Sequence, residues 1–510
     1  MPTPDAAGRI LIRGVNWIGD AVMTMPAIRS VRLAFPAAHI SLLVKPWVAP
    51  LFEKDPCVDE IILYREEHAG IGGKFRLAAE LRKRAFDRAI LLQNAFDAAA
   101  TAFLGGIRER IGYSRDGRGF LLTRAVPFAD QDRRVHHTEY YLSLLGKAGI
   151  PPRRSIPWIW LSLEERLAGR ARLLGLQRPV VALNPGATYG SSKRWQPERF
   201  AEVAERVIGE AGGSVVILGG RSEATIAAEI SGKLLRHAAS RVLSVAGQTG
   251  LRELAGLLSA CDALVTNDSG PMHIGYAVGT PVVAVFGSTS AAETGPLGPR
   301  DVVVSAGLDC APCFERECPT KDLRCMDLVS PERVFDALKP LLPKQRAVFF
   351  DRDGTLCRDA HYLSRMEDFE IFPGIAALAE LKGAGFLLIG ITNQSGIGRG
   401  LVSEEFVRQV NGIFVQSHGF DGFYFCPHHP EDRCSCRKPE PGMLVQARAE
   451  HSIDLRRSFV VGDTDADMQL ARAVGATGIL VRTGQSPDSR LAEHVVADLP
   501  AAVKLVRELA

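Results

Sequence analysis

The chain has 510 residues, a net charge of +3 and 46% hydrophobic residues, so it is too long for one core and we expect two or three domains. The charge is too small to indicate a nucleic-acid partner. No apolar run is long enough to cross a membrane, and residues 1–5 lack the basic and apolar regions of a signal peptide. We therefore expect a cytoplasmic protein, whose ten cysteines are reduced or metal-bound rather than bridged.

The N-terminal part alternates predicted buried strands, at 10–13, 40–44 and 89–92, with helices, which predicts a mostly parallel sheet. The turn at 14–20 has two glycines but lacks a full GxGxxG, so it only weakly supports dinucleotide binding. Asp20 stands in the first turn of the following helix. Spacing alone favours a structural role there, in which the carboxylate serves the helix dipole.

A proline-rich stretch at 150–157 interrupts this pattern and is interpreted as a linker between two lobes. A second β/α series follows it. Its predicted strands are 180–183, 214–218, 242–245, 263–265 and 281–286. Two Rossmann-like lobes joined by a linker predict a ligand-binding cleft between them.

Several turns of the second series are rich in small residues, notably 184–188 and 267–273. Small residues at the start of a helix leave backbone N–H groups open to an anion. Lys193 and His273 can add positive charge or donors for a pyrophosphate. The competing interpretations are a solvated surface lysine and a packing histidine.

Over about residues 8–340 the chain resembles the ADP-heptose:lipopolysaccharide heptosyltransferases of glycosyltransferase family 9, which have the GT-B architecture. The matching stretches are 16–20, 184–187, 192–195 and 267–273. The resemblance implies that Asp20 is the catalytic base for the acceptor hydroxyl. It also implies ADP-L-glycero-D-manno-heptose as donor, held by Thr188, Lys193, Asp268, Ser269, Gly270 and His273. The pattern is closer to the second heptosyltransferase, which extends the inner core.

Four cysteines follow within sixteen residues, Cys310, Cys313, Cys318 and Cys325. Their spacing is irregular, so a metal site and simply packed thiols stay open as alternatives. Residues 331–342 are predicted to form a helix that closes this part of the chain, and 343–346 a short linker.

The predicted strand 347–350 ends in Asp351 and Asp353, which are followed by glycine and threonine. Carboxylates at the end of such a strand lie where open α/β sheets bind ligands. One can attack phosphorus and the other can protonate a leaving oxygen, and together they can hold Mg²⁺. The alternative is a loop that uses aspartate for turn chemistry alone.

Two further strands, 386–391 and 459–462, are predicted to end at the same edge. They deliver Thr392, a donor to a phosphoryl oxygen, and Asp463, which can complete a magnesium site. Lys438 can neutralise charge as a phosphoryl group transfers.

Cysteine and histidine are dense just before this lysine. Cys426, His428, Cys434 and Cys436 place four soft ligands in eleven positions, which is typical of a closed structural zinc site. The alternative is a chance loop of reduced cysteines. Zinc would stiffen the loop that carries Arg437 and Lys438, and the adjacent His429 is interpreted as a spare imidazole.

Residues 346–495 resemble the haloacid-dehalogenase-like phosphatases and, within them, the D-glycero-D-manno-heptose 1,7-bisphosphate 7-phosphatases. The resemblance implies Asp351 as nucleophile, Asp353 as acid and base, and Mg²⁺ bound by Asp351, Asp353 and Asp463. The substrate contacts that it implies are Thr392, Asn393, Arg399, Arg437 and Lys438. One departure is the short interval between His428 and Cys434, as in the histidinol-phosphate phosphatases.

Together these patterns predict an α/β protein: a GT-B glycosyltransferase of two Rossmann-like lobes followed by a haloacid-dehalogenase-like phosphatase. The predicted domains are an acceptor lobe at 1–157, an ADP-heptose lobe at 158–342 and a phosphatase at 346–510. We expect a bifunctional enzyme of lipopolysaccharide core biosynthesis with Mg²⁺ and structural Zn²⁺, whose partners are ADP-heptose, the lipopolysaccharide core acceptor and heptose bisphosphate. Peripheral contact with the cytosolic face of the inner membrane fits this function. The alternatives are a phosphatase for histidinol phosphate, or one half that only binds.

Overall fold

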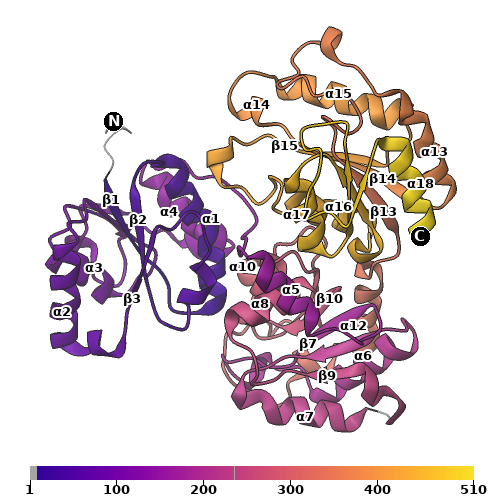
Figure 1. Ribbon diagram of the computed structural model, residues 1–510. Helices are drawn as coiled ribbons and strands as arrows, with labels where there is room; N and C mark the ends of the chain where they lie inside the picture. The colour runs from indigo at the N-terminus through magenta and orange to yellow at the C-terminus, as the bar shows by residue number, and fades with distance from the viewer. Residues whose placement is uncertain (1–7, 235) are drawn as a thin grey trace. The chain divides into compact units, whose positions relative to one another are not determined.

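Three six-stranded parallel sheets make up the protein, and a computed structural model describes residues 8–234 and 236–510 (Figure 1). The strand orders are β3-β2-β1-β4-β5-β6, β12-β11-β10-β7-β8-β9 and β15-β14-β13-β16-β17-β18. Counted within each sheet, all three follow the order 3-2-1-4-5-6 of doubly wound nucleotide-binding folds. The expectation about a signal peptide concerns residues 1–5, which lie outside the described ranges.

The first sheet has two helices on each face. Its strands are β1 (Arg9–Arg13), β2 (His39–Val44), β3 (Glu60–Leu63), β4 (Arg88–Leu91), β5 (Glu109–Tyr113) and β6 (Arg124–Val126). Helices α1 (Ile18–Ala34) and α4 (His137–Lys147) cover one face, and α2 (Gly70–Lys83) and α3 (Phe96–Leu104) cover the other (Figure 1).

The second sheet is covered in the same way. Its strands are β7 (Val180–Asn184), β8 (Ser214–Ile217), β9 (Val242–Ser244), β10 (Ala263–Asn267), β11 (Val282–Phe286) and β12 (Val302–Ser305). Helices α6 (Pro197–Gly209), α7 (Ala224–Lys233) and α12 (Pro331–Leu338) pack together, as do α8 (Leu251–Ser259) and α9 (Gly270–Ala277). The helix predicted over 331–342 is shorter than expected, because α12 ends at Leu338 and a 3₁₀ turn follows.

The third sheet separates two hydrophobic clusters. Its strands are β13 (Arg346–Phe350), β14 (Phe386–Asn393), β15 (Gly422–Cys426), β16 (Phe459–Gly462), β17 (Thr477–Val481) and β18 (His494–Val496). Helices α13 (Leu378–Gly383), α15 (Glu404–Ser417) and α18 (Leu499–Leu509) pack on one face, and α16 (Gly442–His451) and α17 (Asp465–Val474) on the other. A short helix, α14 (Ser395–Gly398), follows β14.

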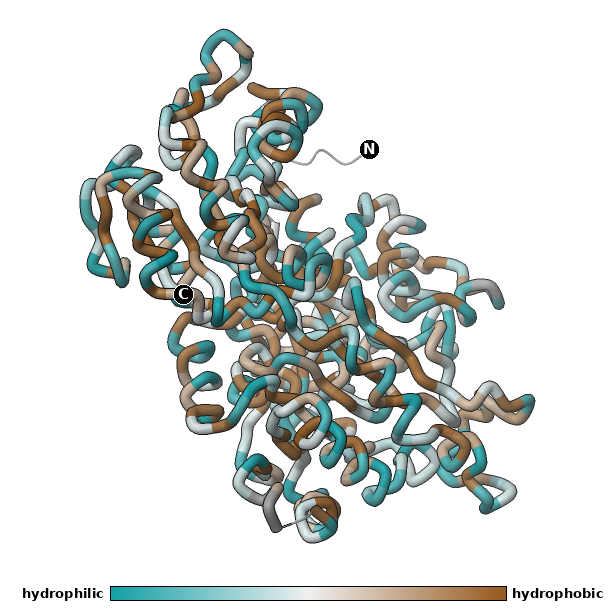
Figure 2. The backbone as a smooth tube through the Cα atoms, turned by 90° about the vertical axis from the view of Figure 1, so that its right-hand side faces the viewer, coloured by the Kyte–Doolittle hydropathy of each residue, from teal (hydrophilic) through white to brown (hydrophobic). Residues whose placement is uncertain are grey.

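The central strands are continuous apolar runs because helices bury them on both faces. All five residues of β7, for example, are buried. Figure 2 shows hydrophobic and hydrophilic stretches alternating along the helices, as expected where one side of a helix packs against a sheet. Within the described residues, no helix is long and apolar enough to span a membrane.

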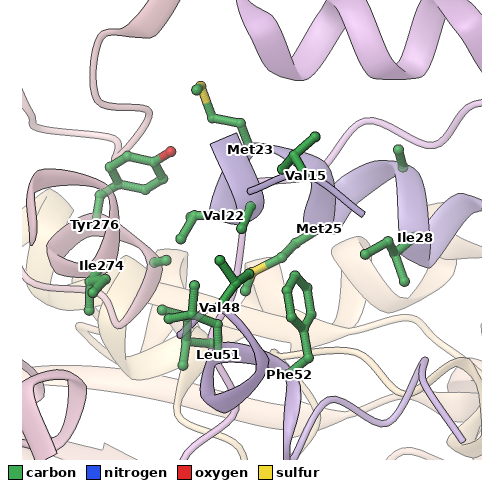
Figure 3. Packing of buried hydrophobic residues seen from close by; sticks show 14 of the residues in the cluster. Val15, Val22, Met23, Met25, Ile28, Val48, Leu51, Phe52, Ile274 and Tyr276 are labelled. Atoms are coloured by element: carbon green, nitrogen blue, oxygen red, sulfur yellow. The ribbon is translucent and has the colours of Figure 1, made fainter. Parts of the chain in front are cut away.

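Helix α1 is buried on nearly every side, because it packs against α4 and against α9 of the second lobe. Figure 3 shows Val22 and Met25 of α1 beside Val48 and Leu51, with Ile274 of α9 close by. This contact brings the N-terminal turns of α1 and α9 together.

Contacts divide the chain into two units. Unit 1 comprises 1–162 and 171–339, and unit 2 comprises 163–170 and 340–510. Unit 2 therefore includes most of α5 (Leu163–Ala171), although this helix comes from the segment between the two lobes of unit 1.

Candidate active sites

The carboxylates predicted for phosphoryl transfer lie where the third sheet reverses its strand order, between β13 and β16. The Asp351 backbone N–H donates to the carbonyl of Val461 at 2.9 Å, which aligns the ends of the two strands. Asp351 and Asp463 follow these strands directly, and Asp467 lies in the first turn of α17. All three are buried, with ligand oxygens within 4.8 Å of one another.

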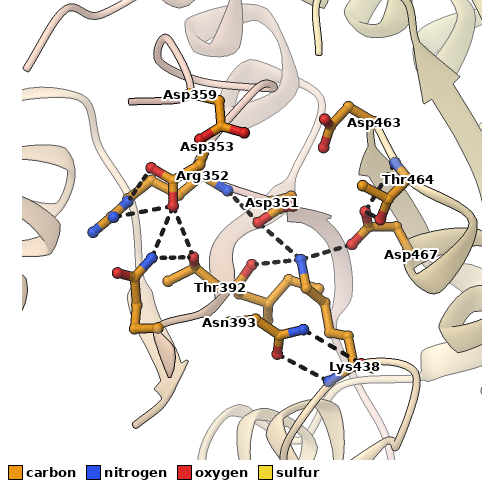
Figure 4. A network of polar contacts seen from close by, with 12 residues as sticks. Asp351, Arg352, Asp353, Asp359, Thr392, Asn393, Lys438, Asp463, Thr464 and Asp467 are labelled. Carbon is orange, nitrogen blue, oxygen red and sulfur yellow. Dashed lines mark hydrogen bonds and ion pairs between the residues drawn. The ribbon is translucent and has the colours of Figure 1, made fainter. Parts of the chain in front are cut away.

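Lys438 is the buried cation among these carboxylates (Figure 4). Its Nζ lies 2.8 Å from Asp351 Oδ1 and 2.7 Å from Asp467 Oδ1. Burial raises the pKa of Asp351 well above its usual value, and Lys438 opposes that rise. Burial lowers the pKa of Lys438, but Asp351 and Asp467 more than offset this and raise it above its ordinary value.

The same arrangement fits a magnesium ion. Three buried carboxylates lie together, two of them in contact with Lys438, and Asp463 Oδ1 is buried without a hydrogen-bond partner. Burial raises the pKa of Asp463 to about 6. Gly354 and Gly484 leave the space beside this carboxylate, because a Cβ at either position would collide with it. A net negative cluster of carboxylate oxygens of this kind suits a hard divalent cation.

Asp353 faces away from the three clustered carboxylates (Figure 4). Its oxygens accept from the Arg352 guanidinium at 3.1 and 3.0 Å and from Gln394 Nε2 at 2.8 Å. Thr392 lies 3.4 Å from the same carboxylate. The group that could hold a metal thus contains Asp467, which is not in the predicted set, and lacks the carboxylate of Asp353, which is.

The other predicted phosphatase contacts occupy different positions. Asn393 fixes the Lys438 backbone, because its Oδ1 accepts from the Lys438 N–H at 3.0 Å and its Nδ2 donates to the Lys438 carbonyl at 3.3 Å. Arg437 is half-buried, and its Nη1 is buried without a hydrogen-bond partner. Arg399 is exposed at the end of α14.

The predicted zinc ligands converge at the end of β15. Cys426, His428, Cys434 and Cys436 place one ligand atom each within 4.8 Å of the others. The Cys426 and Cys434 sulfurs are 3.4 Å apart, and His428 Nδ1 is 3.2 Å from Cys436 Sγ. Separations of this size match the edges of a tetrahedron around one zinc ion. His429 stays outside the group, and its Nδ1 accepts from the Glu431 N–H at 3.2 Å.

In unit 1, Asp20 lies in the first turn of α1 and has a partner that the sequence did not suggest. Its Oδ1 is 3.2 Å from Nδ1 of His137, the first residue of α4. Asp20 is partly exposed, so its carboxylate is held in place without being withdrawn from solvent. A held, accessible carboxylate is suited to accept a proton from a bound hydroxyl.

His273 lies directly against the start of α1. A Cβ on Gly19 would come 2.7 Å from the His273 ring. Burial lowers the pKa of His273 to about 4, and its Nδ1 is 3.1 Å from the Tyr276 hydroxyl. At neutral pH His273 is therefore uncharged, and of its two predicted roles it can provide a hydrogen bond and not positive charge.

The predicted donor-binding residues surround Asp268. Lys193 Nζ lies 2.6 Å from Asp268 Oδ2, and the Thr289 hydroxyl donates to the same oxygen at 2.6 Å. Ser269 accepts from Asn184 Nδ2 at 2.8 Å, which joins the ends of β7 and β10. Gly270 begins α9 against Ile18. Thr188 is exposed in the loop after β7.

Glu223 is a candidate that the sequence reasoning missed. Its Oε2 accepts from the Gly220 N–H at 2.7 Å, and its carboxylate fills the space beside Gly186. The signal was present in the sequence: a glycine pair follows β8, and an acidic residue stands three positions after the second glycine. A carboxylate at this point of a Rossmann-like lobe can accept from the hydroxyls of a ribose.

The cysteine-rich segment supports the loop that carries Lys193. The Tyr189 hydroxyl donates to the Phe314 carbonyl at 2.7 Å, and the Ser192 N–H donates to the Arg316 carbonyl at 3.2 Å. Cys310 is exposed, and Cys313, Cys318 and Cys325 are half-buried. Among the described residues, no three of these sulfurs lie within 4.8 Å of one another, as the four predicted zinc ligands do.

Comparison with known proteins finds two families in succession. Residues 74–324 match glycosyltransferase family 9 (heptosyltransferase), and residues 435–505 match a HAD-hydrolase-like family. Lipopolysaccharide heptosyltransferase 2 of Escherichia coli is 30% identical over 66% of this chain and 100% of its own length. The structure of E. coli ADP-heptose LPS heptosyltransferase II, 29% identical, superposes with a TM-score of 0.57 over 65% of this chain and 98% of that one.

The phosphatase similarity is closer in sequence. D-glycero-beta-D-manno-heptose-1,7-bisphosphate 7-phosphatase of Photorhabdus laumondii is 41% identical over 32% of this chain and 97% of its own length. Both relatives are covered almost completely. The chain therefore belongs to the family 9 heptosyltransferases in its first two thirds and to the heptose bisphosphate 7-phosphatases in its last third.

Proposed function

We propose that this protein is a bifunctional enzyme of lipopolysaccharide core biosynthesis. It transfers heptose from ADP-heptose to the core acceptor, and it removes the 7-phosphate of D-glycero-D-manno-heptose 1,7-bisphosphate. The observation that carries the proposal is that each part covers nearly the whole length of a relative named for this same sugar. The lobes at 1–157 and 158–342 then take acceptor and donor, and 346–510 the bisphosphate.

For phosphate release, Asp351 is the proposed nucleophile. Its carboxylate oxygen attacks the phosphorus at C7 while the bond from phosphorus to the sugar oxygen breaks. Asp353 gives its proton to that leaving oxygen and then takes one from the water that hydrolyses the aspartyl-phosphate. Thr392 and Lys438 are the proposed partners of the phosphoryl oxygens, and Arg399 and Arg437 are proposed to bind the rest of the substrate.

Magnesium is the proposed ion of this site. Asp351, Asp463 and Asp467 would hold it. The alternative ligand set is the one predicted from the sequence, in which Asp353 replaces Asp467. When bound, the ion supplies positive charge that offsets the charge of the phosphoryl oxygens. Lys438 supplies the complementary charge from the protein, which the two contacts to Asp351 and Asp467 hold in position.

Zinc at Cys426, His428, Cys434 and Cys436 is proposed as structural. The four ligands close the site, so no position is open for substrate. The ligand Cys436 is two residues from Lys438 in sequence. A rigid loop at this point would limit the motion of Arg437 and Lys438.

For heptose transfer, Asp20 is the proposed base. It takes the proton of the acceptor hydroxyl as the oxygen bonds to the anomeric carbon and the bond from that carbon to the diphosphate breaks. Lys193 and the N-terminal turn of α9 neutralise charge on the departing ADP, and neutral His273 donates a hydrogen bond. Glu223, whose carboxylate is held by the Gly220 N–H, is the proposed acceptor for the ribose hydroxyls. We propose that heptose transfer takes place at the cytosolic face of the inner membrane, where peripheral contact would bring the enzyme to its lipid-linked acceptor.

A panel of sugar phosphates tests the substrate of the phosphatase. Purified full-length protein should release phosphate from heptose 1,7-bisphosphate at a higher kcat/KM than from histidinol phosphate. The same preparation should convert ADP-heptose and a heptose-deficient core acceptor to ADP and extended core. A preference for histidinol phosphate would contradict the assignment of the last third.

A further inference from the structure

Helix α5 comes from one family but packs in the unit of the other. It lies inside the stretch that matches the heptosyltransferases, residues 74–324, yet residues 163–170 belong to unit 2 by their contacts. The chain thus enters unit 2 at 163, returns to unit 1 at 171 and enters unit 2 again at 340. A segment of eight residues that leaves and re-enters a unit calls for a specific attachment.

Arg170 provides that attachment at the C-terminal end of α17. Its Nη1 donates to the Ala473 carbonyl at 3.0 Å, and its Nη2 donates to the Arg472 carbonyl. The last carbonyls of a helix lack partners inside the helix and carry the negative end of its dipole, so a guanidinium satisfies both needs. The helix stops at Gly475, where φ is +81° and where an added Cβ would lie 3.2 Å from Arg170 Nη1.

The opposite end of α17 carries a component of the phosphatase site. Asp467 lies in the first turn of this helix and holds Lys438 at 2.7 Å. A ten-residue helix is about 15 Å long and moves as a stiff rod, so its C-terminal anchor limits the tilt of its first turn.

A second residue of α5 acts on the loop after Lys438. The side chain of Arg166 is buried, and its charge acts on the carboxyl of Glu440, two residues beyond Lys438. Burial raises the pKa of Glu440, and the nearby Arg166 opposes that rise. Helix α5 therefore reaches both members of the Lys438–Asp467 ion pair indirectly. Arg170 binds the end of α17, the helix that carries Asp467, and Arg166 acts on Glu440 in the loop that follows Lys438.

We propose that α5 is a working part of the phosphatase and that Arg170 is a positioning residue for phosphate release, which acts through α17 on Asp467 and Lys438. The inference rests on the proposed phosphatase function. It adds that a helix encoded within the transferase sequence completes the phosphatase site.

Full-length variants at one position test this. Arg170→Ala should lower kcat for phosphate release by about tenfold, since misplacement of about 1 Å near a reacting group can cost up to 100-fold. It should also raise the Mg²⁺ concentration needed for half-maximal rate. Arg170→Lys, which keeps the charge and one set of donors, should recover part of the rate. Hydrogen exchange should speed up in 465–474, and heptose transfer should stay unchanged.

Arg172→Ala is the matched control, because Arg172 belongs to unit 1 and lies 4.0 Å from Glu253. It should leave phosphate release and Mg²⁺ dependence as in the wild type. Equal kinetics for Arg170→Ala and Arg172→Ala would overturn the inference. If Arg170→Ala does not accumulate, Arg170→Gln replaces it under the same criteria. A wild-type enzyme that releases no phosphate from heptose bisphosphate would instead refute the proposed function.

Discussion

At the scale of single residues, both sites use buried groups whose charge is set by their surroundings. Lys438 is charged because two carboxylates offset its burial, and His273 is neutral because burial dominates. The two residues therefore act differently: Lys438 supplies positive charge, and of the two roles predicted for His273, positive charge or a hydrogen-bond donor, only the second fits a neutral ring. Sequence shows which side chain is present, but its charge depends on neighbours that come from distant segments.

The neutral state of His273 predicts a pH-dependent stability of unit 1. Because the folded pKa is about 4 and the unfolded value is near 6.5, the unfolded chain binds the extra proton between these values. The contribution of neutral His273 to the free energy of unfolding is complete above pH 6.5 and is lost as the pH falls toward 4. Between pH 7 and pH 5 the free energy of unfolding should fall by about 2 kcal/mol because of this group. The His273→Asn variant should not show this part of the decrease.

Tryptophan fluorescence during urea unfolding can measure this, since all five tryptophans lie in unit 1. The quantity to compare is the change in unfolding midpoint from pH 7 to pH 5 in the two proteins. Identical changes would show that His273 is not the group responsible. A histidine outside the buried contact, such as exposed His361→Asn in unit 2, serves as the control.

At the scale of elements, function depends on where two helices or a loop meet. The close approach of α1 and α9 requires glycine at position 19, because a methyl group there would lie 2.7 and 2.9 Å from His273 ring atoms. His273 is buried and packs against Tyr276, so it has little room to move.

Gly19→Ala should therefore separate α1 from α9 and lower kcat/KM for heptose transfer by about ten- to 100-fold. Phosphate release should be unaffected. Gly72→Ala is the control, since that glycine lies within α2 with open space around it. Alanine is the better helix former by about 1 kcal/mol, so this variant should be fully active and no less stable. Wild-type transfer by Gly19→Ala would refute the tight contact.

The loop between β15 and α16 gives a second prediction at this scale. Cys434→Ser should lose zinc, measured by mass spectrometry of the purified protein, and should lower kcat for phosphate release as the loop around Lys438 loosens. His429→Asn should retain both zinc and activity, because His429 lies outside the ligand group. Zinc retained in Cys434→Ser, or lost in His429→Asn, would show that the ligand set is wrong.

At the scale of the whole molecule, the two activities should be separable by single substitutions. Asp20→Asn should reduce heptose transfer by at least about a thousandfold and leave phosphate release intact, and Asp351→Asn should do the reverse. Asp368→Asn, at a partly exposed carboxylate paired with Arg365, should change neither activity. Each protein is assayed for both reactions. Loss of both activities in either variant would contradict the assignment of one base and one nucleophile to separate units.

The sequence was sufficient for the fold wherever strands are continuous apolar runs, as at 180–183 and 347–350, which became β7 and β13. It was also sufficient for residues placed directly after those strands, such as Asp351. It was insufficient where partners come from distant elements. Nothing local to Asp467 indicates that it faces Lys438, and nothing near Asp20 indicates His137. The boundaries between the predicted domains stay predictions.

The route of α5 also bears on how the two enzymes can be taken apart. A gene divided in the linker at 343–346 would yield a shorter phosphatase whose chain lacks residues 163–170. The last carbonyls of α17 would then face water instead of a guanidinium. Residues 163–170 could be restored to the isolated phosphatase as a separate peptide or by grafting them onto its new N-terminus. A phosphatase separated from this fusion therefore needs a helix that the gene encodes upstream of the cut.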